Sequence, residues 1–236
     1  MSAAKHLLDA WHRWLLPWRC LLCGDAGMDG IDLCAACIAE WPRNTPCCAR
    51  CALPLPASAP QCGRCLLKAP PWDAAWAPFR YAWPLDRLET RFKFGRDLAA
   101  GRALAQVWRH ETPRALPQLI LPVPLHPRRL RQRGHNQALE LARPLARSLR
   151  IPCRWDVLQR VRHTDAQTSL TAIERRRNLR NAFALRKGAQ LPAHVAVLDD
   201  VFTTGATLAE CAAVLKRAGV ARVDVWALAR APIPGR

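Results

Sequence analysis

The chain has 236 residues, half of them apolar, so it can form one large domain or a medium domain with a small appendage. Its 36 Lys and Arg residues against 18 Asp and Glu give a formal charge of +18, which favours a polyanionic or phosphorylated partner. With half of its residues apolar, the chain can bury an ordinary hydrophobic core.

The N-terminal segment contains Trp11, Trp14 and Trp18 at helical spacing. Asp9 and Arg13 interrupt its apolar runs, so the segment is neither a signal peptide nor long enough to span a bilayer. We therefore expect an N-terminal helix, no membrane insertion and a cytoplasmic location. Cysteines stay reduced in the cytosol, where pairs of them hold metal more often than they form disulfides.

Cysteine dominates the next segment, since nine of the eleven cysteines lie between Cys20 and Cys65. Four pairs share the spacing Cys-x-x-Cys, and two such turns can place four thiolates around one tetrahedral ion. Four pairs predict two structural Zn²⁺ sites, with the ligands Cys20, Cys23, Cys34, Cys37, Cys48, Cys51, Cys62 and Cys65. Four thiolates leave the ion no open position for a substrate. Residues 1–70 are therefore expected to form a small zinc-ribbon domain that is structural or an interaction surface.

Two arrangements of these pairs remain open. Sequential pairing joins the first pair with the second and the third with the fourth. A cross-brace joins the first with the third and the second with the fourth. Cys47 adjoins Cys48 and is an alternative ligand in its place.

Residues 71–236 are expected to form the second domain, in which short apolar runs alternate with helical patterns. The expected strands are 77–83, 119–123, 153–158, 195–198 and 223–228, and the expected helices are 85–94, 98–110, 137–149 and 206–218. Short runs that are wholly apolar are typical of buried parallel strands. The alternation predicts an α/β domain, a parallel sheet flanked by helices, with ligands at the carboxyl ends of the strands.

The segment VLDDVFTTGAT combines the features of a phosphate site and a sugar site. Asp199 and Asp200 are expected at the end of the strand 195–198, where they can accept hydrogen bonds from sugar hydroxyls. A loop of small and hydroxyl-bearing residues follows directly before a helix, whose free N–H groups and dipole favour an anion. This loop consists of Thr203, Thr204, Gly205, Ala206 and Thr207. Phosphate at one end and a diol at the other predict a ribose 5-phosphate.

This loop resembles, nearly residue for residue, the loop of type I phosphoribosyltransferases that binds phosphoribosyl pyrophosphate. Further motifs extend the resemblance, in chain order, to the ComF family. They are the cysteine pairs, Lys93-Phe94-Gly95, the loop 122–137 with Arg133-Gly134-His135-Asn136-Gln137, and the stretch 162–183 with Gln167, Arg175, Arg177 and Asn178. The resemblance covers most of the chain and implies a type I phosphoribosyltransferase-like sheet.

The resemblance also implies roles for these segments. Asp199 and Asp200 would contact the ribose hydroxyls, and residues 203–207 would bind the 5-phosphate. The loop after the strand 119–123 would hold the pyrophosphate with Mg²⁺, and its residues are Pro124, Leu125, Arg128, Arg131 and Arg133. The stretch 162–183 would be a flexible flap that offers Arg162, Gln167, Arg175 and Arg177 to the anion. The family is associated with natural transformation and the handling of incoming single-stranded DNA.

Two positions depart from these patterns. Purine phosphoribosyltransferases usually carry an acidic residue at the place of Thr203, so purine salvage is not expected. His135 stands where the ComF family frequently has an aromatic residue such as Phe, and we expect it to pack in the same way.

Two functions are compatible with these observations. The first is a phosphoribosyltransferase that moves the phosphoribosyl group to an acceptor while pyrophosphate leaves from the Arg-rich loop. The second is a non-catalytic module that retains the nucleotide-sugar site and binds single-stranded DNA or a DNA-translocating helicase through its basic surface and zinc ribbon.

Overall fold

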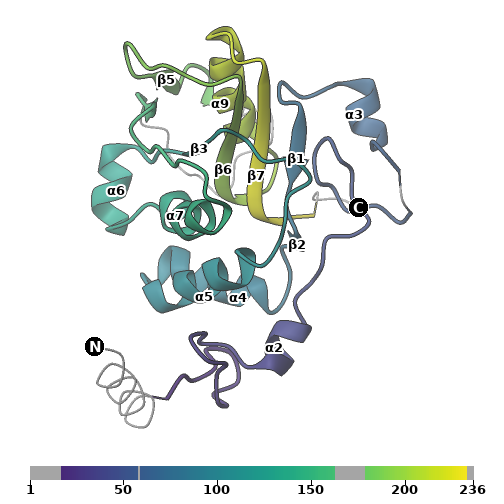
Figure 1. Ribbon diagram of the computed structural model, residues 1–236, viewed down its shortest axis with the longest axis vertical. Coiled ribbons are helices and arrows are strands. Elements are labelled where there is room, and N and C mark those ends of the chain that lie inside the picture. Colours follow the sequence, from purple (N-terminus) through teal and green to yellow (C-terminus); the bar gives the residue numbers. More distant parts are fainter. Residues whose placement is uncertain (1–16, 58, 163–178, 233–236) are drawn as a thin grey trace.

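The structure is a computed structural model that describes residues 17–57, 59–162 and 179–232. The expected N-terminal helix around Trp11 and Trp14 lies outside the described residues, as does most of the expected flap. Figure 1 shows a layered α/β body, with the cysteine-rich segment running from beneath α4 and α5 to the far side of β1.

Helices and strands are interspersed along the described chain, mostly in pairs of the same kind. The helices are α2 (Ala35–Ala39), α3 (Gly63–Leu67), α4 (Leu85–Phe94), α5 (Leu98–Trp108), α6 (Pro127–Arg133), α7 (Gln137–Leu149) and α9 (Ala206–Arg217). The strands are β1 (Ala74–Trp76), β2 (Phe79–Arg80), β3 (Leu119–Pro122), β4 (Leu158–Arg160), β5 (Phe183–Leu185), β6 (His194–Phe202) and β7 (Arg222–Arg230).

The central sheet is parallel and has the order β1-β7-β6-β3, with β2 following β1 along the same edge of β7. The register of β6 on β7 runs from His194 opposite Arg222 to Phe202 opposite Arg230. Residues 195–198 of β6 are fully buried, as expected for a strand covered on both faces. This confirms the α/β fold class with a mostly parallel sheet.

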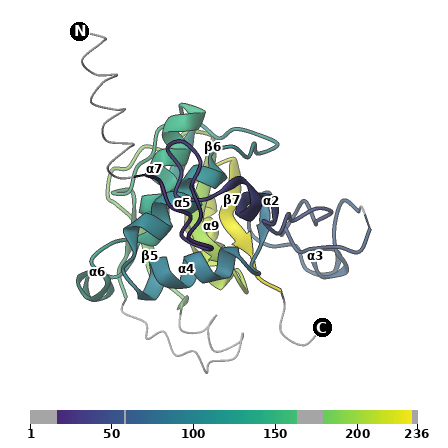
Figure 2. The same ribbon diagram turned by 90° about the horizontal axis from the view of Figure 1, so that it is seen from below.

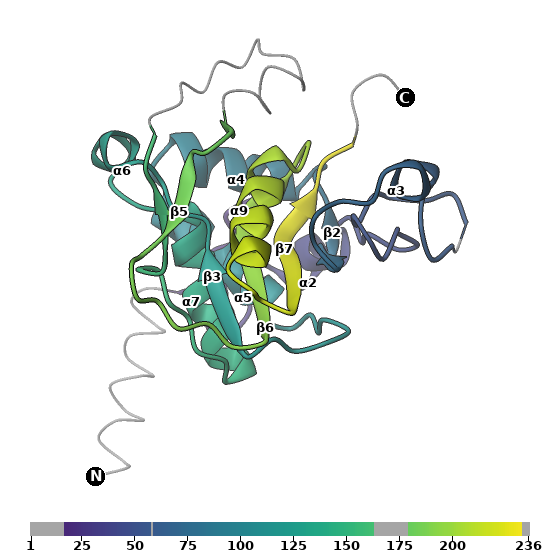
Figure 3. The same cartoon turned by 90° about the horizontal axis from the view of Figure 1, so that it is seen from above.

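Helices cover both faces of this sheet. Helix α9 packs on β6 and β7 from one side, and α7, with α5 packed against it, covers β3 and β6 from the other. Figure 3 shows α9 in front of the strands and α4 and α5 beyond them. Helix α4 buries Leu85, Leu88 and Phe92, which recur at the spacing of one helix face. Gly101 of α5 lets the two helices approach closely, because a Cβ there would meet the Phe92 ring at 2.4 Å.

The cysteine-rich segment shares the core of the sheet. Cys20, Leu33, Trp41 and Ala52 belong to the same buried cluster as the strands and helices of the α/β body. Figure 2 shows α2 and α3 beside the body, on the side of β7. The boundary expected at residue 70 stays a prediction.

Three expected elements differ from the structure. The strand expected at 77–83 lies earlier and is split into β1 and β2. The strand expected at 153–158 is not part of the central sheet, since Cys153 forms one isolated bridge to Ile120 and β4 pairs with β5 instead. The strand expected to end at residue 198 continues to Phe202, so the two aspartates lie inside β6 rather than after it.

Candidate functional site

All eight expected cysteine ligands gather into two clusters of four. The sulfur atoms of each cluster lie within 4.8 Å of one another, and the clusters are Cys20, Cys23, Cys34 and Cys37, and Cys48, Cys51, Cys62 and Cys65. Sulfur atoms approach to 3.6 Å in the first cluster and 3.7 Å in the second. A tetrahedral Zn²⁺ with Zn–S bonds of about 2.3 Å separates its sulfurs by about 3.8 Å. Donor type and spacing therefore fit two structural Zn²⁺ ions.

The pairing of the cysteines is sequential. The first two Cys-x-x-Cys turns form one cluster and the last two form the other, which excludes the cross-brace. Cys48 lies in the second cluster, whereas its neighbour Cys47 is half-buried outside it. The amide of Cys62 donates to the Cys48 sulfur at 3.3 Å, as is usual for a thiolate held in a tight turn.

Hydrogen bonds tie each cluster to a different part of the α/β body. Arg91 of α4 donates to the carbonyl oxygen of Leu21, within the first cluster, at 2.7 Å. Arg230 of β7 donates to the carbonyl oxygen of Cys51, within the second, at 3.1 Å. The two zinc clusters are therefore bound to different elements of the α/β body, α4 and β7.

An ion cluster lies near the carboxyl end of β6. Nζ of Lys93 lies 2.9 Å from Oδ2 of Asp200 and 3.1 Å from Oε1 of Glu89. Tyr81 donates from its hydroxyl to the second oxygen of Glu89 at 3.2 Å. The amide of Asp200 donates to Oδ1 of Asp199 at 2.9 Å. Strand β6, helix α4 and the turn after β2 thus place three carboxylates, an ammonium and a phenol together.

The two aspartates differ in charge state. Burial, together with the charge of Asp200, raises the pKa of Asp199 to about 8. Burial acts in the same direction on Asp200, but the ammonium of Lys93 outweighs it and lowers the pKa of that carboxyl. Burial alone would lower the pKa of Lys93, yet Asp200 and Glu89 raise it above its ordinary value. Asp200 is therefore the ionised member of the pair at neutral pH.

The expected phosphate loop, residues 203–207, connects β6 to α9. Gly205 adopts a left-handed conformation with φ +77°, and a Cβ there would meet the Phe202 ring at 2.6 Å. Helix α9 starts at Ala206, and its N-cap residue is Gly205, which has no side chain to cap the helix. Thr203 is exposed and Thr204 half-buried, with the Thr204 hydroxyl 3.4 Å from the amide of Ala206. The helix start therefore presents amide donors and hydroxyls beside the acidic pair.

The expected pyrophosphate loop contains helix α6, which the sequence analysis did not predict. Pro124, Leu125 and Arg133 are half-buried, whereas Arg128 and Arg131 are exposed. Burial and the nearby Arg129 lower the pKa of Arg133, while Asp200, Glu89 and Asp199 oppose that shift. Arg133 is thus within electrostatic reach of the acidic cluster, and the other two arginines face solvent.

His135 packs as an aromatic ring. It stacks on Phe92 with ring centres 5.0 Å apart, and its Nε2 lies 3.3 Å from the side-chain nitrogen Nε2 of Gln137. Gln137 in turn accepts from Arg133 at 2.9 Å. This stack fixes the entry to α7 beside the site.

The expected flap is described only in part. Arg162 donates to the carbonyl oxygen of Arg180 at 2.7 Å, which joins the two described ends of the stretch. Gln167, Arg175 and Arg177 lie outside the described residues.

Sequence reasoning missed Glu89, Tyr81 and Arg230. Glu89 had a signal, because it stands four residues before Lys93 on the face of α4 that carries Leu85, Leu88 and Phe92. Arg230 had a weaker one, since it is a charged residue directly after the apolar run 225–229. Tyr81 is the sole tyrosine of the chain but carries no pattern.

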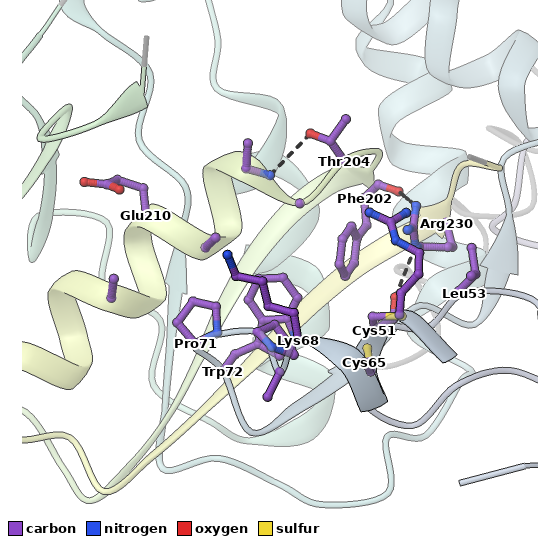
Figure 4. A pocket seen from close by; sticks show the side chains of 17 residues that line it. Cys51, Leu53, Cys65, Lys68, Pro71, Trp72, Phe202, Thr204, Glu210 and Arg230 are labelled. Carbon is purple, nitrogen blue, oxygen red and sulfur yellow. Dashed lines mark hydrogen bonds between the residues drawn. The ribbon is translucent and has the colours of Figure 1, made fainter. Parts of the chain in front are cut away.

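A cavity of about 560 Å³ separates the second zinc cluster from the start of α9. Its walls include Cys65, Trp72, Phe202, Gly205 and Arg230 (Figure 4). Thr204, Gly205 and Ala206 of the loop therefore border this cavity. Across the described part of the chain, no helix is long and apolar enough to cross a membrane.

Comparisons with known proteins agree with this geometry. Residues 11–66 match the family model of the double zinc ribbon domain. The chain is 40% identical over 171 residues to Competence protein F of Haemophilus influenzae, which covers 69% of this chain and 75% of that protein. It is 41% identical over 172 residues to DNA utilization protein YhgH of Escherichia coli strain K12, covering 69% and 74%. Competence protein ComFC of Streptococcus pneumoniae is 27% identical over 154 residues, covering 65% and 67%.

Proposed function

The chain belongs to the ComF family, and on this premise we propose that it binds phosphoribosyl pyrophosphate with Mg²⁺ and serves in competence, as DNA uptake or DNA utilisation. The role in DNA handling is supported by the names of the relatives, two of which are competence proteins and one a DNA utilization protein. The ligand is supported by the geometry of the site.

One observation carries the ligand proposal. Asp199 and Asp200 lie in the C-terminal half of β6, within a few residues of the start of α9. Carboxylates accept hydrogen bonds from the ribose hydroxyls, and the amides of the loop 203–207 donate to the 5-phosphate. Acceptors followed closely in the chain by donors correspond to the two ends of a phosphoribosyl group.

The chain's own residues account for the rest of the site. Arg133 lies close enough to interact with the acidic cluster. The exposed Arg128 and Arg131 provide donors for the two phosphates of the leaving group. Lys93 keeps Asp200 ionised, so that carboxylate can stabilise positive charge on the ribose as the bond from C1 to pyrophosphate breaks. Mg²⁺ would be held with the pyrophosphate at the loop of Pro124 and Leu125, where it would neutralise the charge of the leaving group.

A calorimetric titration with phosphoribosyl pyrophosphate and Mg²⁺ tests the ligand proposal. Asp200→Ala and Asp199→Ala are expected to weaken binding strongly, whereas Asp156→Ala, which alters a half-buried aspartate paired with Arg154 and Arg186, should leave it unchanged. Absence of binding by the wild-type chain would overturn the proposal. Release of pyrophosphate in the presence of acceptors would then separate an enzyme from a binding module.

A second function, binding of single-stranded DNA without turnover, is favoured by Phe94. Its side chain is 71% exposed next to Lys93, and the guanidinium of Arg133 lies 5.8 Å from its ring centre. An exposed ring among arginines is the arrangement on which bases stack while cations follow the phosphates. Exposed Trp155, flanked by Arg154, offers a similar arrangement elsewhere.

Fluorescence anisotropy with a labelled single strand tests this second function. Phe94→Ala should weaken DNA binding and Trp83→Ala, which removes an exposed ring before the other end of α4, should not. Equal affinities of the two variants would remove Phe94 from the interface.

We also propose a cytoplasmic location, a domain boundary near residue 70 and a closing role for Gln167, Arg175 and Arg177.

A further inference from the structure

Arg230 lies buried behind the phosphate loop. It ends β7, is 3% exposed, and its guanidinium sits 4.3 Å from the centre of the Phe202 ring. Its Nη1 lies 2.6 Å from the carbonyl oxygen of Thr203 and 2.7 Å from those of Phe202 and Ala231. A buried cation is thus surrounded by carbonyl oxygens, two of which open the phosphate loop.

These contacts fix the direction of two peptide groups. In a trans peptide the C=O and the following N–H point in opposite directions. Since the carbonyls of Phe202 and Thr203 point at Arg230, the N–H groups of Thr203 and Thr204 point away from it. Resting on the function proposed for this loop, we propose that Arg230 is a positioning residue that turns the loop's amide donors toward the 5-phosphate.

The same arginine joins the loop to the second zinc cluster. Its Nε donates to the carbonyl oxygen of Cys51 at 3.1 Å. A second link runs through Trp72, whose Nε1 donates to the carbonyl oxygen of Arg50 at 2.6 Å and whose ring meets Phe202 edge-on at 5.6 Å. Figure 4 shows Arg230 between Cys51 and Phe202, and Trp72 farther along the cavity beside Pro71. Two adjacent residues of one zinc turn therefore hold the phosphate loop from behind.

A purely structural role is the competing explanation. The thiolates of Cys51, Cys62 and Cys65 are near enough to interact electrostatically with Arg230, so the guanidinium would then serve only to balance the charge of the zinc cluster. The two roles differ in what is lost on substitution. A charge-balancing arginine protects zinc binding, whereas a positioning arginine protects affinity for phosphate.

Arg230→Ala in the full, zinc-loaded chain separates these roles. We expect its affinity for ribose 5-phosphate, measured by calorimetry, to fall about tenfold or more, because misaligned amides lose charge-assisted hydrogen bonds. Zinc content per chain should equal that of the wild type. Guanidinium ion at millimolar concentration should restore affinity, since Arg230 lines the cavity of about 560 Å³ through which the ion can enter. Arg222→Ala, at the other end of β7, is the matched control and should bind as the wild type does.

Hydrogen exchange of the amides 203–208 in the ligand-free protein is the second measurement. Exchange should be faster in Arg230→Ala and slow again with guanidinium. Unchanged affinity in this variant, or a loss that parallels zinc loss and resists guanidinium, overturns the inference and leaves the proposed function standing. Failure of the wild type to bind either ribose 5-phosphate or phosphoribosyl pyrophosphate overturns both.

Discussion

Nζ of Lys93 lies 2.9 Å from Oδ2 of Asp200, and this contact joins helix α4 to the strand that carries the acidic pair. The same ammonium contacts Glu89 at 3.1 Å, so one cation holds two carboxylates in place. The acidic cluster is therefore partly neutralised before any ligand binds, which reduces the cost of bringing an anionic ligand beside two aspartates.

Replacing Lys93 tests this arrangement. Lys93→Met leaves two buried carboxylates without their cation, and we expect the free energy of unfolding to fall by up to about 3 kcal/mol at neutral pH. The lowered pKa of Asp200 means that its contribution is present above its unfolded pKa and is lost as the pH falls through the folded value, so the cost should shrink below about pH 4. Urea denaturation at both pH values measures it. Lys216→Met, which breaks a more exposed pair with Asp73, should cost about 1 kcal/mol or less, and equal costs would contradict the prediction.

The protonation of Asp199 gives a prediction with the opposite sign. Burial and Asp200 raise the pKa of Asp199 in the folded protein to about 8. Its contribution to stability is therefore fully present below the pKa of the unfolded chain and is lost as the pH rises through the folded pKa. Asp199→Asn has no proton to lose. The Tm of this variant should therefore rise relative to wild type from about pH 5 to about pH 9.

Asp156→Asn is the control for this titration. Its hydrogen bonds with Arg154 hold the pKa of Asp156 at about 2, so it does not titrate in that window. A constant difference between Asp199→Asn and wild type across the window would show that Asp199 is already ionised.

Gly205→Ala should damage the phosphate loop through both backbone and packing. Gly205 and Gly188 have similar φ values of +77° and +75°, but a Cβ at Gly205 would meet Phe202 at 2.6 Å, whereas nothing lies within 4 Å at Gly188. Gly188→Ala should cost about 1 kcal/mol for its backbone conformation, and Gly205→Ala at least about 1 kcal/mol more. Denaturant midpoints give both values, and phosphate binding should be lost only in Gly205→Ala. Similar stability losses would show that Phe202 moves aside without cost.

The two cysteine clusters predict how zinc content responds to substitution. Cys62→Ser should leave one Zn²⁺ per chain and lower the Tm, because metal binding contributes folding free energy. Cys47→Ser should keep two, since Cys47 lies outside both clusters. Elemental analysis of the purified variants measures the stoichiometry. Loss of a zinc ion in Cys47→Ser would reassign the ligand set.

Patterns with a single physical cause could be predicted from the sequence. Helices α4 and α7 match their expected bounds, because apolar spacing reports a buried helix face directly. The eight cysteine ligands follow from spacing alone, but their sequential pairing does not, because it depends on the path of the chain between the turns.

Features that depend on tertiary partners could not be predicted. The segment after Cys153 is apolar enough for a strand, yet Asp156 pairs with Arg154 and Arg186 and the ladder forms later, at β4. An apolar run indicates burial but does not name the neighbour. The acidic cluster was predicted only in part for the same reason, since Glu89 and Tyr81 are linked to Asp200 only through Lys93 of α4.

The central position of β7 has a consequence for how the molecule is made. This strand comes last in the described sequence, yet it lies between β6 and the edge formed by β1 and β2. During synthesis the ribosome releases β1, β2 and β6 before their common neighbour exists, so the sheet closes after translation of residues 222–230. Arg230 is at the very end of that strand, so its contacts with the carbonyl oxygens of Phe202 and Thr203 can form only after the other strands of the central sheet have been synthesised.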